Sequence, residues 1–140
     1  MNNHKDILEQ MKFKVIGAFY IEDNSFIVDC DEKYLQLEQM IYIHTIDGEI
    51  VRIGSSKNKL KSRMRSWERD VTKALNGLKS STPLWESEKW REILNNKKGV
   101  LYGRQGTTIK TPAGEFNSYL SEESFLIGKF TPKMNRSKHR

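Results

Sequence analysis

Cysteine is nearly absent from this sequence, and long apolar runs are absent altogether. Cys30 has no second cysteine to pair with, so the chain can form neither an internal disulfide nor a cysteine-based zinc cluster. We expect Cys30 to act as a small hydrophobic side chain. No apolar run approaches the roughly 18 residues that a membrane helix needs, and the opening MNNHKDILEQMKFK lacks the apolar stretch of a secretory signal. These absences predict a protein of a reducing, cytoplasmic compartment with no membrane partner.

Internal repeats, low-complexity blocks and linkers rich in glycine, serine or proline are also missing. A chain of 140 residues is long enough for one hydrophobic core and short for two. Hydrophobic residues make up 36% of it and charged residues 30%, which is typical of a globular protein with a polar surface. We therefore predict a single domain over residues 1–140.

Acidic residues are scarce in the second part of the chain. The formal net charge of +6 divides into −5 over residues 1–56 and +11 over residues 57–140. A compact chain with this asymmetry presents a basic face, for which a phosphate backbone is the commonest partner. Lysines on solvated helices explain the same charge equally well. Charge alone therefore indicates nucleic acid without excluding the simpler interpretation.

The clearest local signal is a hairpin. An Asp47-Gly48 pair separates two runs rich in β-branched residues, Met40–Ile46 and Glu49–Gly54. The pair suits a two-residue turn, because both turn positions need positive φ. His44 lies within the first predicted strand, where a lone histidine is more often structural than catalytic.

Helical periodicity follows this hairpin. Between Asn58 and Leu78, apolar residues recur every three or four positions, which predicts one helix with a core-facing stripe. The other predicted elements are two strands around a turn at Asp23-Asn24, a short helix over 32–37, a helix opened by Thr82 as N-cap and Pro83 as first residue, strands over 99–103 and 107–109, and a last helix capped by Ser121 that runs to Phe130.

Several residues, in order along the chain, resemble the pattern of the GIY-YIG nucleases. They are Met40-Ile41-Tyr42, Arg52-Ile53-Gly54, Arg63, Glu123, Pro132 and Asn135. In that family, the two strands of a hairpin carry the name-giving tripeptides, and the following helix supplies an arginine. A later helix supplies a metal-binding glutamate, and an asparagine follows it after a proline. The resemblance covers residues 40–67 and 119–136 and leaves 1–39 as an N-terminal strand extension and about 80–118 as an insertion.

Three residues depart from the family pattern. Met40 replaces the first glycine, a change that the backbone accepts where φ is negative. Arg52 replaces the second tyrosine with a permanent cation, as in some restriction-type members. Trp67 stands where members often carry histidine or tyrosine. Because an indole N–H donates a hydrogen bond but cannot accept a proton, Trp67 is predicted to belong to the core.

Two adjacent carboxylates compete for the glutamate position. Glu123 stands at helical spacing from Leu126, Ile127 and Phe130 and shares their core-facing stripe, whereas Glu122 does not. A carboxylate aimed at an apolar face requires a cation, and a divalent metal or an arginine would supply one. Helical phase and the family spacing both favour Glu123. The alternative is that both carboxylates only complement the dipole of the helix.

The basic residues divide into two groups. Arg63 borders the apolar stripe of its helix, either as a catalytic cation or as an aliphatic stem packed over Trp67. The predicted phosphate contacts to DNA are Lys57, Lys59, Lys61, Arg65, Arg69, Lys133 and Arg136.

The resemblance implies an α/β (α+β) fold, with a small antiparallel or mixed sheet that contains the GIY-YIG hairpin and is flanked by helices. It implies a DNA endonuclease that uses one Mg²⁺ or Mn²⁺ ion per site, with Tyr42 as general base, Arg52 and Arg63 on the scissile phosphate, Glu123 on the metal and Asn135 as a brace. The compact length favours a type II restriction endonuclease, a homodimer on double-stranded DNA in a bacterial or phage-infected cell. The alternatives are a phage or mobile-element endonuclease and an inactive DNA-binding module.

Overall fold

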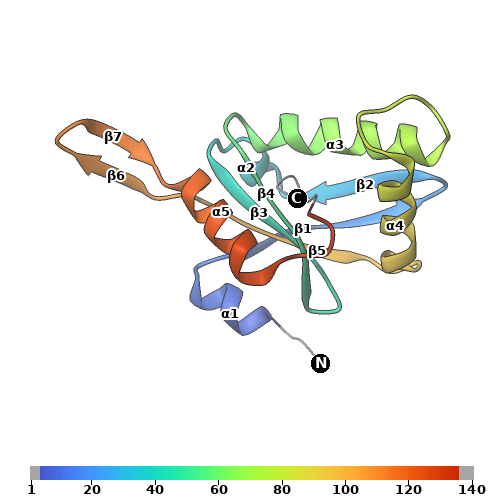
Figure 1. Cartoon of the computed structure of the whole chain (residues 1–140), viewed down its shortest axis with the longest axis horizontal. Coiled ribbons are helices and arrows are strands. Elements are labelled where there is room, and N and C mark those ends of the chain that lie inside the picture. Colours follow the sequence, from blue (N-terminus) through green and yellow to red (C-terminus); the bar gives the residue numbers. More distant parts are fainter. Residues whose placement is uncertain (1–3, 136–140) are drawn as a thin grey trace.

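The computed structural model describes residues 4–135 and contains one antiparallel five-stranded sheet with helices on both faces (Figure 1). The sheet has the strand order β2-β1-β5-β3-β4. Its strands are β1 (Lys14–Glu22), β2 (Ser25–Cys30), β3 (Met40–Ile46), β4 (Glu49–Ser56) and β5 (Gly99–Gln105). The helices are α1 (Lys5–Gln10), α2 (Glu32–Leu35), α3 (Leu60–Leu75), α4 (Leu84–Leu94) and α5 (Tyr119–Phe130). The predicted fold class is confirmed.

The two predicted hairpins of the sheet are also confirmed. Asp23 and Asn24 join β1 to β2, and Asp47 and Gly48 join β3 to β4. All four residues have positive φ, which is the geometry of a two-residue turn that follows the right-handed twist of its strands. The strand order makes β4 an edge of the sheet, so one side of the second hairpin remains open to other segments.

The central strand comes from a part of the chain outside the family resemblance. β5 lies between β1 and β3 and pairs antiparallel with both. The N-terminal strands and the segment around 80–118 are therefore structural parts of the sheet on which the β3–β4 hairpin rests.

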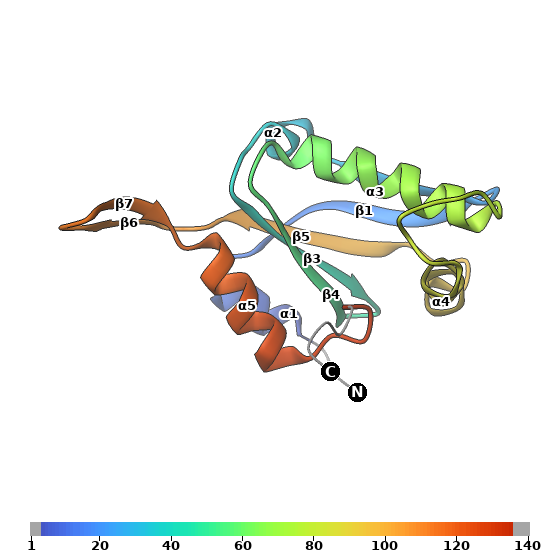
Figure 2. The ribbon, with the colours of Figure 1, turned by 45° about the horizontal axis from the view of Figure 1, so that its top comes forward.

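Helices cover the two faces of the sheet separately. Figure 2 shows α3 on one side of the sheet and α5 with α1 on the other, while α4 lies across one end. On the α3 side, an aromatic core joins Phe19, Phe26, Trp67 and Trp90. A second core lies on the α5 side, with Ile41, Ile43, Ile53 and Leu126 among its members. Alternate residues of β3 enter alternate cores, as the two-residue period of a strand requires.

Two predicted helix starts are wrong by a few residues. Pro83, with φ −64° and ψ 149°, is the N-cap of α4 and not its first helical residue, so Thr82 lies outside the helix. Helix α5 begins earlier than predicted, because its N-cap is Ser118 and not Ser121. The Ser118 Oγ donates to Glu122 four residues later, while its backbone carbonyl accepts the first helical N–H. Pro132 follows the end of α5, as predicted.

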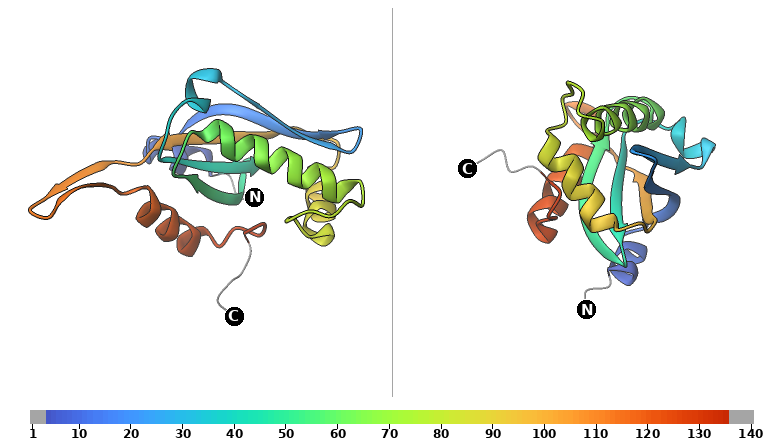
Figure 3. Two further views of the ribbon diagram at one scale, coloured as in Figure 1. Left: turned by 90° about the horizontal axis from the view of Figure 1, so that it is seen from above. Right: turned by 90° about the vertical axis from the view of Figure 1, so that its right-hand side faces the viewer.

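A second, separate hairpin projects from the body of the molecule. It consists of β6 (Thr108–Thr111) and β7 (Gly114–Asn117), and it extends beyond α5 (Figure 3). Sequence reasoning predicted the first of these strands and missed the second. In the part of the chain that the structure describes, no helix has the length and apolar character to cross a membrane.

Candidate active site

A cleft opens along the β4 edge of the sheet. It has a volume of about 650 Å³, and helices α3 and α5 form its opposite walls. Four of the five predicted site residues line it: Arg52, Arg63, Glu123 and Asn135. They come from β4, α3, α5 and the segment after α5, so the antiparallel hairpin and its two flanking helices bring distant residues together.

The fifth predicted residue, Tyr42, lies beneath the cleft on β3. It is 1% exposed and pairs across the hairpin with Gly54. A Cβ atom at Gly54 would lie 2.5 Å from the Tyr42 hydroxyl oxygen, which is closer than real Cβ contacts. Gly54 therefore leaves the space that the phenol occupies, and this close approach explains the glycine of the second tripeptide.

Two arginines converge on the Tyr42 hydroxyl. The Arg63 Nε donates to it at 3.2 Å, and an Arg52 Nη donates at 3.4 Å. Burial by itself raises the pKa of Tyr42, but the two positive charges and their hydrogen bonds outweigh burial and hold that pKa below its ordinary value. The arrangement favours a phenolate, as expected when two cations donate to one phenol oxygen.

Neither arginine is neutralised by a carboxylate. Among the described residues, no aspartate or glutamate lies within ion-pair distance of the Arg52 or Arg63 guanidinium. The pKa of Arg63 is raised, chiefly by the nearby Tyr42 oxygen. Both cations therefore border the cleft with charge available to an anion that enters it.

Glu122 and Glu123 have different surroundings. Glu122 accepts hydrogen bonds from Arg104 and from the Ser118 hydroxyl, and these outweigh partial burial and lower its pKa. Glu123 lines the cleft and accepts one hydrogen bond, from the Ser55 hydroxyl at 2.7 Å. The structure thus directs Glu123 to the cleft and Glu122 to a structural ion pair, the separation that helical phase predicted.

The donor set suits a hard divalent cation held partly by other ligands. Within the described chain, no group of three or more histidine, cysteine, aspartate or glutamate side chains is arranged to hold a metal ion. Mg²⁺ commonly uses one or two carboxylates and completes its shell with water and substrate phosphate oxygens. The Glu123 carboxylate fits this mode, with the Ser55 hydroxyl as a neighbouring oxygen.

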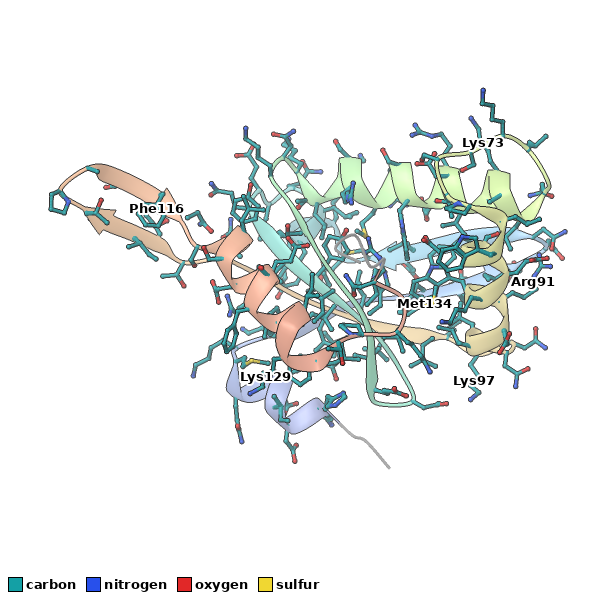
Figure 4. The ribbon with its side chains drawn as sticks, viewed as in Figure 1. Lys73, Arg91, Lys97, Phe116, Lys129 and Met134 are labelled. Carbon is teal, nitrogen blue, oxygen red and sulfur yellow. The ribbon has the colours of Figure 1, made fainter. Side chains whose placement is uncertain are left out.

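Asn135 fastens the segment after α5 to the sheet edge. Its Oδ1 accepts from the Ile53 N–H and its Nδ2 donates to the Ile53 carbonyl, both at 2.9 Å. The Met134 N–H donates to the Val51 carbonyl, and Figure 4 shows Met134 on this returning segment. Backbone groups of an edge strand that would otherwise remain open are thereby paired. Asn135 holds β4 between Arg52 and Gly54.

The predicted DNA-contacting cations have varied positions. Lys57, Lys59 and Lys61 are exposed around the start of α3, and the Lys59 ammonium donates to Gln36. Arg65 contacts Glu68 and the Val28 carbonyl beside β2, on the opposite side of α3 from Arg63. The two remaining described cations are ion-paired: Arg69 with Asp70 and Lys133 with Glu49. Arg136 lies outside the described residues.

The structure adds residues that sequence reasoning did not place in the site. Trp67, Asp70 and Glu86 line the cleft, and Ser55 contacts Glu123. Asp70 could have been found, because it lies seven residues after Arg63 and therefore on the same helical face. Glu86 had no comparable signal, since only the packing of α4 brings it to the cleft.

Comparisons with known proteins agree on the fold. No protein-family model matches the sequence, and no curated protein matches it. Among solved structures, an alanine mutant of bacteriophage T4 EndoII is similar with a TM-score of 0.66 and 22% identity, over 96% of this chain and 100% of that one. The restriction endonuclease HPY188I, solved with product DNA, is similar with a TM-score of 0.56 and 19% identity, over 92% of this chain and 79% of that one. The chain therefore has a nuclease fold.

Proposed function

We propose that this protein is a divalent-metal-dependent DNA endonuclease of the GIY-YIG type. The observation that carries the proposal is the cleft in which Arg52 and Arg63 converge on the Tyr42 hydroxyl, in the same cleft as the Glu123 carboxylate. A phenol, two unneutralised cations and a carboxylate supply a base, phosphate ligands and a metal ligand. These groups can together catalyse phosphodiester hydrolysis.

Each residue has a distinct role in this proposal. Tyr42 in its phenolate form accepts the proton of the attacking water. Arg52 and Arg63 bind the scissile phosphate and offset the negative charge that grows on it. A Mg²⁺ or Mn²⁺ ion held by Glu123 would stabilise the leaving oxygen. Asn135 keeps β4 in place, so that Arg52 faces the phosphate.

The substrate class is double-stranded DNA, and the favoured biological role is that of a type II restriction endonuclease acting as a homodimer. The arginine at position 52 and the likeness to HPY188I support this role. The likeness to bacteriophage T4 EndoII over the whole of that chain supports a phage endonuclease instead. Restriction predicts cuts confined to one short palindrome, because two-fold symmetry of a dimer is mirrored in its site.

The test is incubation of a supercoiled plasmid with the protein and Mg²⁺ or Mn²⁺, followed by mapping of the ends on several DNAs. We expect cleavage that depends on the added ion and on Glu123, with Glu123→Gln as the inactive control. Tight DNA binding without any cleavage would instead identify an inactive DNA-binding module. The oligomeric state is measured separately, by light scattering of the protein with and without DNA.

A further inference from the structure

Trp67 lies at the boundary between the cleft and the aromatic core. One part of its ring lines the cleft, and the residue is 8% exposed. From the core side, Phe26 and Trp90 meet it edge-on with ring centroids at 4.8 and 5.1 Å, and His44 lies tilted at 4.6 Å. Three rings thus fix the plane of the indole.

The guanidinium of Arg52 lies over this fixed indole face. Its central carbon is 4.8 Å from the Trp67 ring centroid and 5.8 Å from that of Tyr42. This position leaves an Arg52 Nη at 3.4 Å from the Tyr42 hydroxyl. No described carboxylate pairs with Arg52, so its guanidinium is held by the Trp67 face and by the Tyr42 side chain.

The group that orients the Arg52 guanidinium determines how much of its positive charge remains available to a phosphate. A carboxylate would orient the guanidinium strongly but would also cancel the charge that a phosphate has to meet. An aromatic face attracts a cation through its quadrupole and leaves the N–H donors free. A tryptophan has the strongest such face among the aromatic side chains.

We propose that Trp67 is a positioning residue that holds the Arg52 guanidinium beside the Tyr42 hydroxyl without neutralising it. The proposal rests on the proposed function for its catalytic meaning, and it makes the two departures at positions 52 and 67 a matched pair. An arginine in place of the second tyrosine needs an orienting group, and a tryptophan in the next helix supplies it.

His44 packs against Trp67 from the core side of the sheet. It pairs across the hairpin with Arg52 and is fully buried, and neither of its ring nitrogens has a hydrogen-bond partner among the described residues. Burial, aided by the Arg52 charge, holds the pKa of His44 well below its ordinary value. The charged or titratable groups facing Tyr42 are therefore Arg52 from β4, Arg63 from α3 and a neutral His44 from β3 itself.

The test uses three single variants, one double variant and two reference variants of the full chain. Trp67→Leu removes the π face, Trp67→Phe keeps a smaller one, and Arg52→Met removes the cation. Trp85→Phe is the control, because Trp85 is also a tryptophan but is exposed on α4 and does not line the cleft. Circular dichroism and thermal unfolding identify the variants that fold, and Trp67→Phe serves if Trp67→Leu does not.

Two readouts are measured for each variant. The first is the pKa of Tyr42 in the free protein, obtained from ultraviolet absorbance after subtraction of the Tyr42→Phe titration. The second is the single-turnover rate of plasmid cleavage. We expect Trp67→Leu to raise the Tyr42 pKa and to slow cleavage by about 5–30-fold, the range of a desolvated cation–π contact. Trp67→Phe should lie between Trp67→Leu and the wild type, and Trp85→Phe should change neither quantity.

The double variant decides the mechanism. In the Arg52→Met background, Trp67→Leu should cause no further change in the Tyr42 pKa, because the two residues act through one contact. An unchanged Tyr42 pKa in Trp67→Leu, or additive effects of the two substitutions, would overturn the proposal. If the Tyr42 pKa responds as expected while no variant or wild type cleaves DNA, Trp67 still positions Arg52, and it is the nuclease function that fails.

Discussion

Most described arginines outside the cleft pair with a carboxylate, and the two inside it do not. Arg65 pairs with Glu68, Arg69 with Asp70 and Arg104 with Glu122, while Arg91 donates to the side-chain oxygen of Asn24. Inside the cleft, Arg52 and Arg63 contact a phenol oxygen and an indole face and pair with no carboxylate of the described residues.

The lack of a carboxylate partner for Arg52 and Arg63 indicates that the cleft binds an anion. Arg52 is partly buried, and a partly buried cation without a counter-charge is unfavourable unless a ligand provides one, whereas Arg63 is exposed. The neighbouring carboxylates repeat the contrast, since Glu122 pairs with Arg104, whereas the described hydrogen-bond partner of Glu123 is the Ser55 hydroxyl and its charge acts on Arg63 without an ion pair. Among the described residues, the cleft therefore holds two arginines and a glutamate that form no ion pair, an arrangement that suits a phosphate and a metal ion.

The largest effect on cleavage is expected from removal of the Glu123 carboxylate. We expect Glu123→Gln to abolish cleavage while leaving metal-free DNA affinity within a few-fold of the wild type, because the amide keeps the shape and loses the charge that holds a cation. Single-turnover cleavage and a binding titration measure the two quantities.

Glu122→Gln is the matched control and should retain activity. The Glu122 pKa is lowered in the fold, so its ion pair stabilises the protein at neutral pH and loses that effect as the pH falls through this pKa. Its substitution should therefore reduce stability modestly, as seen in thermal unfolding. Equal loss of cleavage in both variants would mean that both carboxylates act in the reaction.

The next largest effect is expected at Tyr42. Tyr42→Phe keeps the packing and removes the hydroxyl that both arginines contact, so it should slow single-turnover cleavage by about 10²–10⁴-fold, the usual contribution of a general base. A variant that folds, binds DNA and cuts at close to the wild-type rate would assign Tyr42 to the core.

The pH dependence of the cleavage rate provides a second test of Tyr42 as the general base. The arginines hold the Tyr42 pKa below its ordinary value, and the phenolate forms as the pH rises through that pKa. Wild-type cleavage at saturating metal, followed from about pH 6 to 9, should therefore accelerate with rising pH until the phenol is fully ionised, while Tyr42→Phe shows no such rise.

A smaller effect is expected at Asn135, where two roles have to be distinguished: positioning of β4 for cleavage and stabilisation of the fold. Asn135→Ala leaves the Ile53 N–H and carbonyl without their partners, which should reduce the free energy of unfolding by about 1–3 kcal/mol. Misplacement of β4 should also slow cleavage, by up to about 10²-fold.

Asn117→Ala is the comparison for this prediction. Asn117 also makes two backbone hydrogen bonds, to Gly106 and Tyr119, at the base of the β6–β7 hairpin. It should lose similar stability and keep its cleavage rate. If the two variants slow equally, Asn135 contributes stability alone.

The sequence predicts those structural features that are encoded by residues close together in the chain. The Asp47-Gly48 turn and the apolar stripe of α3 are encoded within a few residues, and both are confirmed. The order of motifs also picked out residues that the fold gathers into one cleft.

The sequence did not predict contacts between elements that are distant in the chain. The Arg52–Trp67 contact arises only where β4 passes α3, so Trp67 was assigned to the core alone. The partners of Arg65 and the arrival of Glu86 at the cleft also depend on packing between distant elements. The start of α5 was misplaced because Ser118 and Ser121 are equally good caps by residue type.

The smallest expected effect concerns the exposed lysines. If Lys59 and Lys61 bind DNA phosphates, the Lys59→Ala/Lys61→Ala variant should flatten the dependence of log affinity on log salt, on all sequences alike. The slope should change by about 0.9 for each phosphate that the variant no longer neutralises. Metal-free binding at several salt concentrations measures this slope.

The charge-matched control is Lys97→Ala/Lys98→Ala. Lys97 pairs with Asp47 and follows the end of α4 that is distant from Glu86 (Figure 4). This control should leave the slope unchanged. Equal slopes for the two double variants would place the DNA footprint elsewhere on the molecule.

The hydrogen bonds between Asn135 and Ile53 join two residues that are synthesised at different times. The two residues are 82 positions apart, and Glu123 likewise follows the hairpin by most of that interval. At roughly 5–20 residues per second, about 4–16 s separate translation of Ile53 from that of Asn135. A nascent chain therefore carries the tyrosine and both arginines well before the carboxylate and the brace exist. On the proposed function, a nascent chain lacks a complete active site until Asn135 has been synthesised.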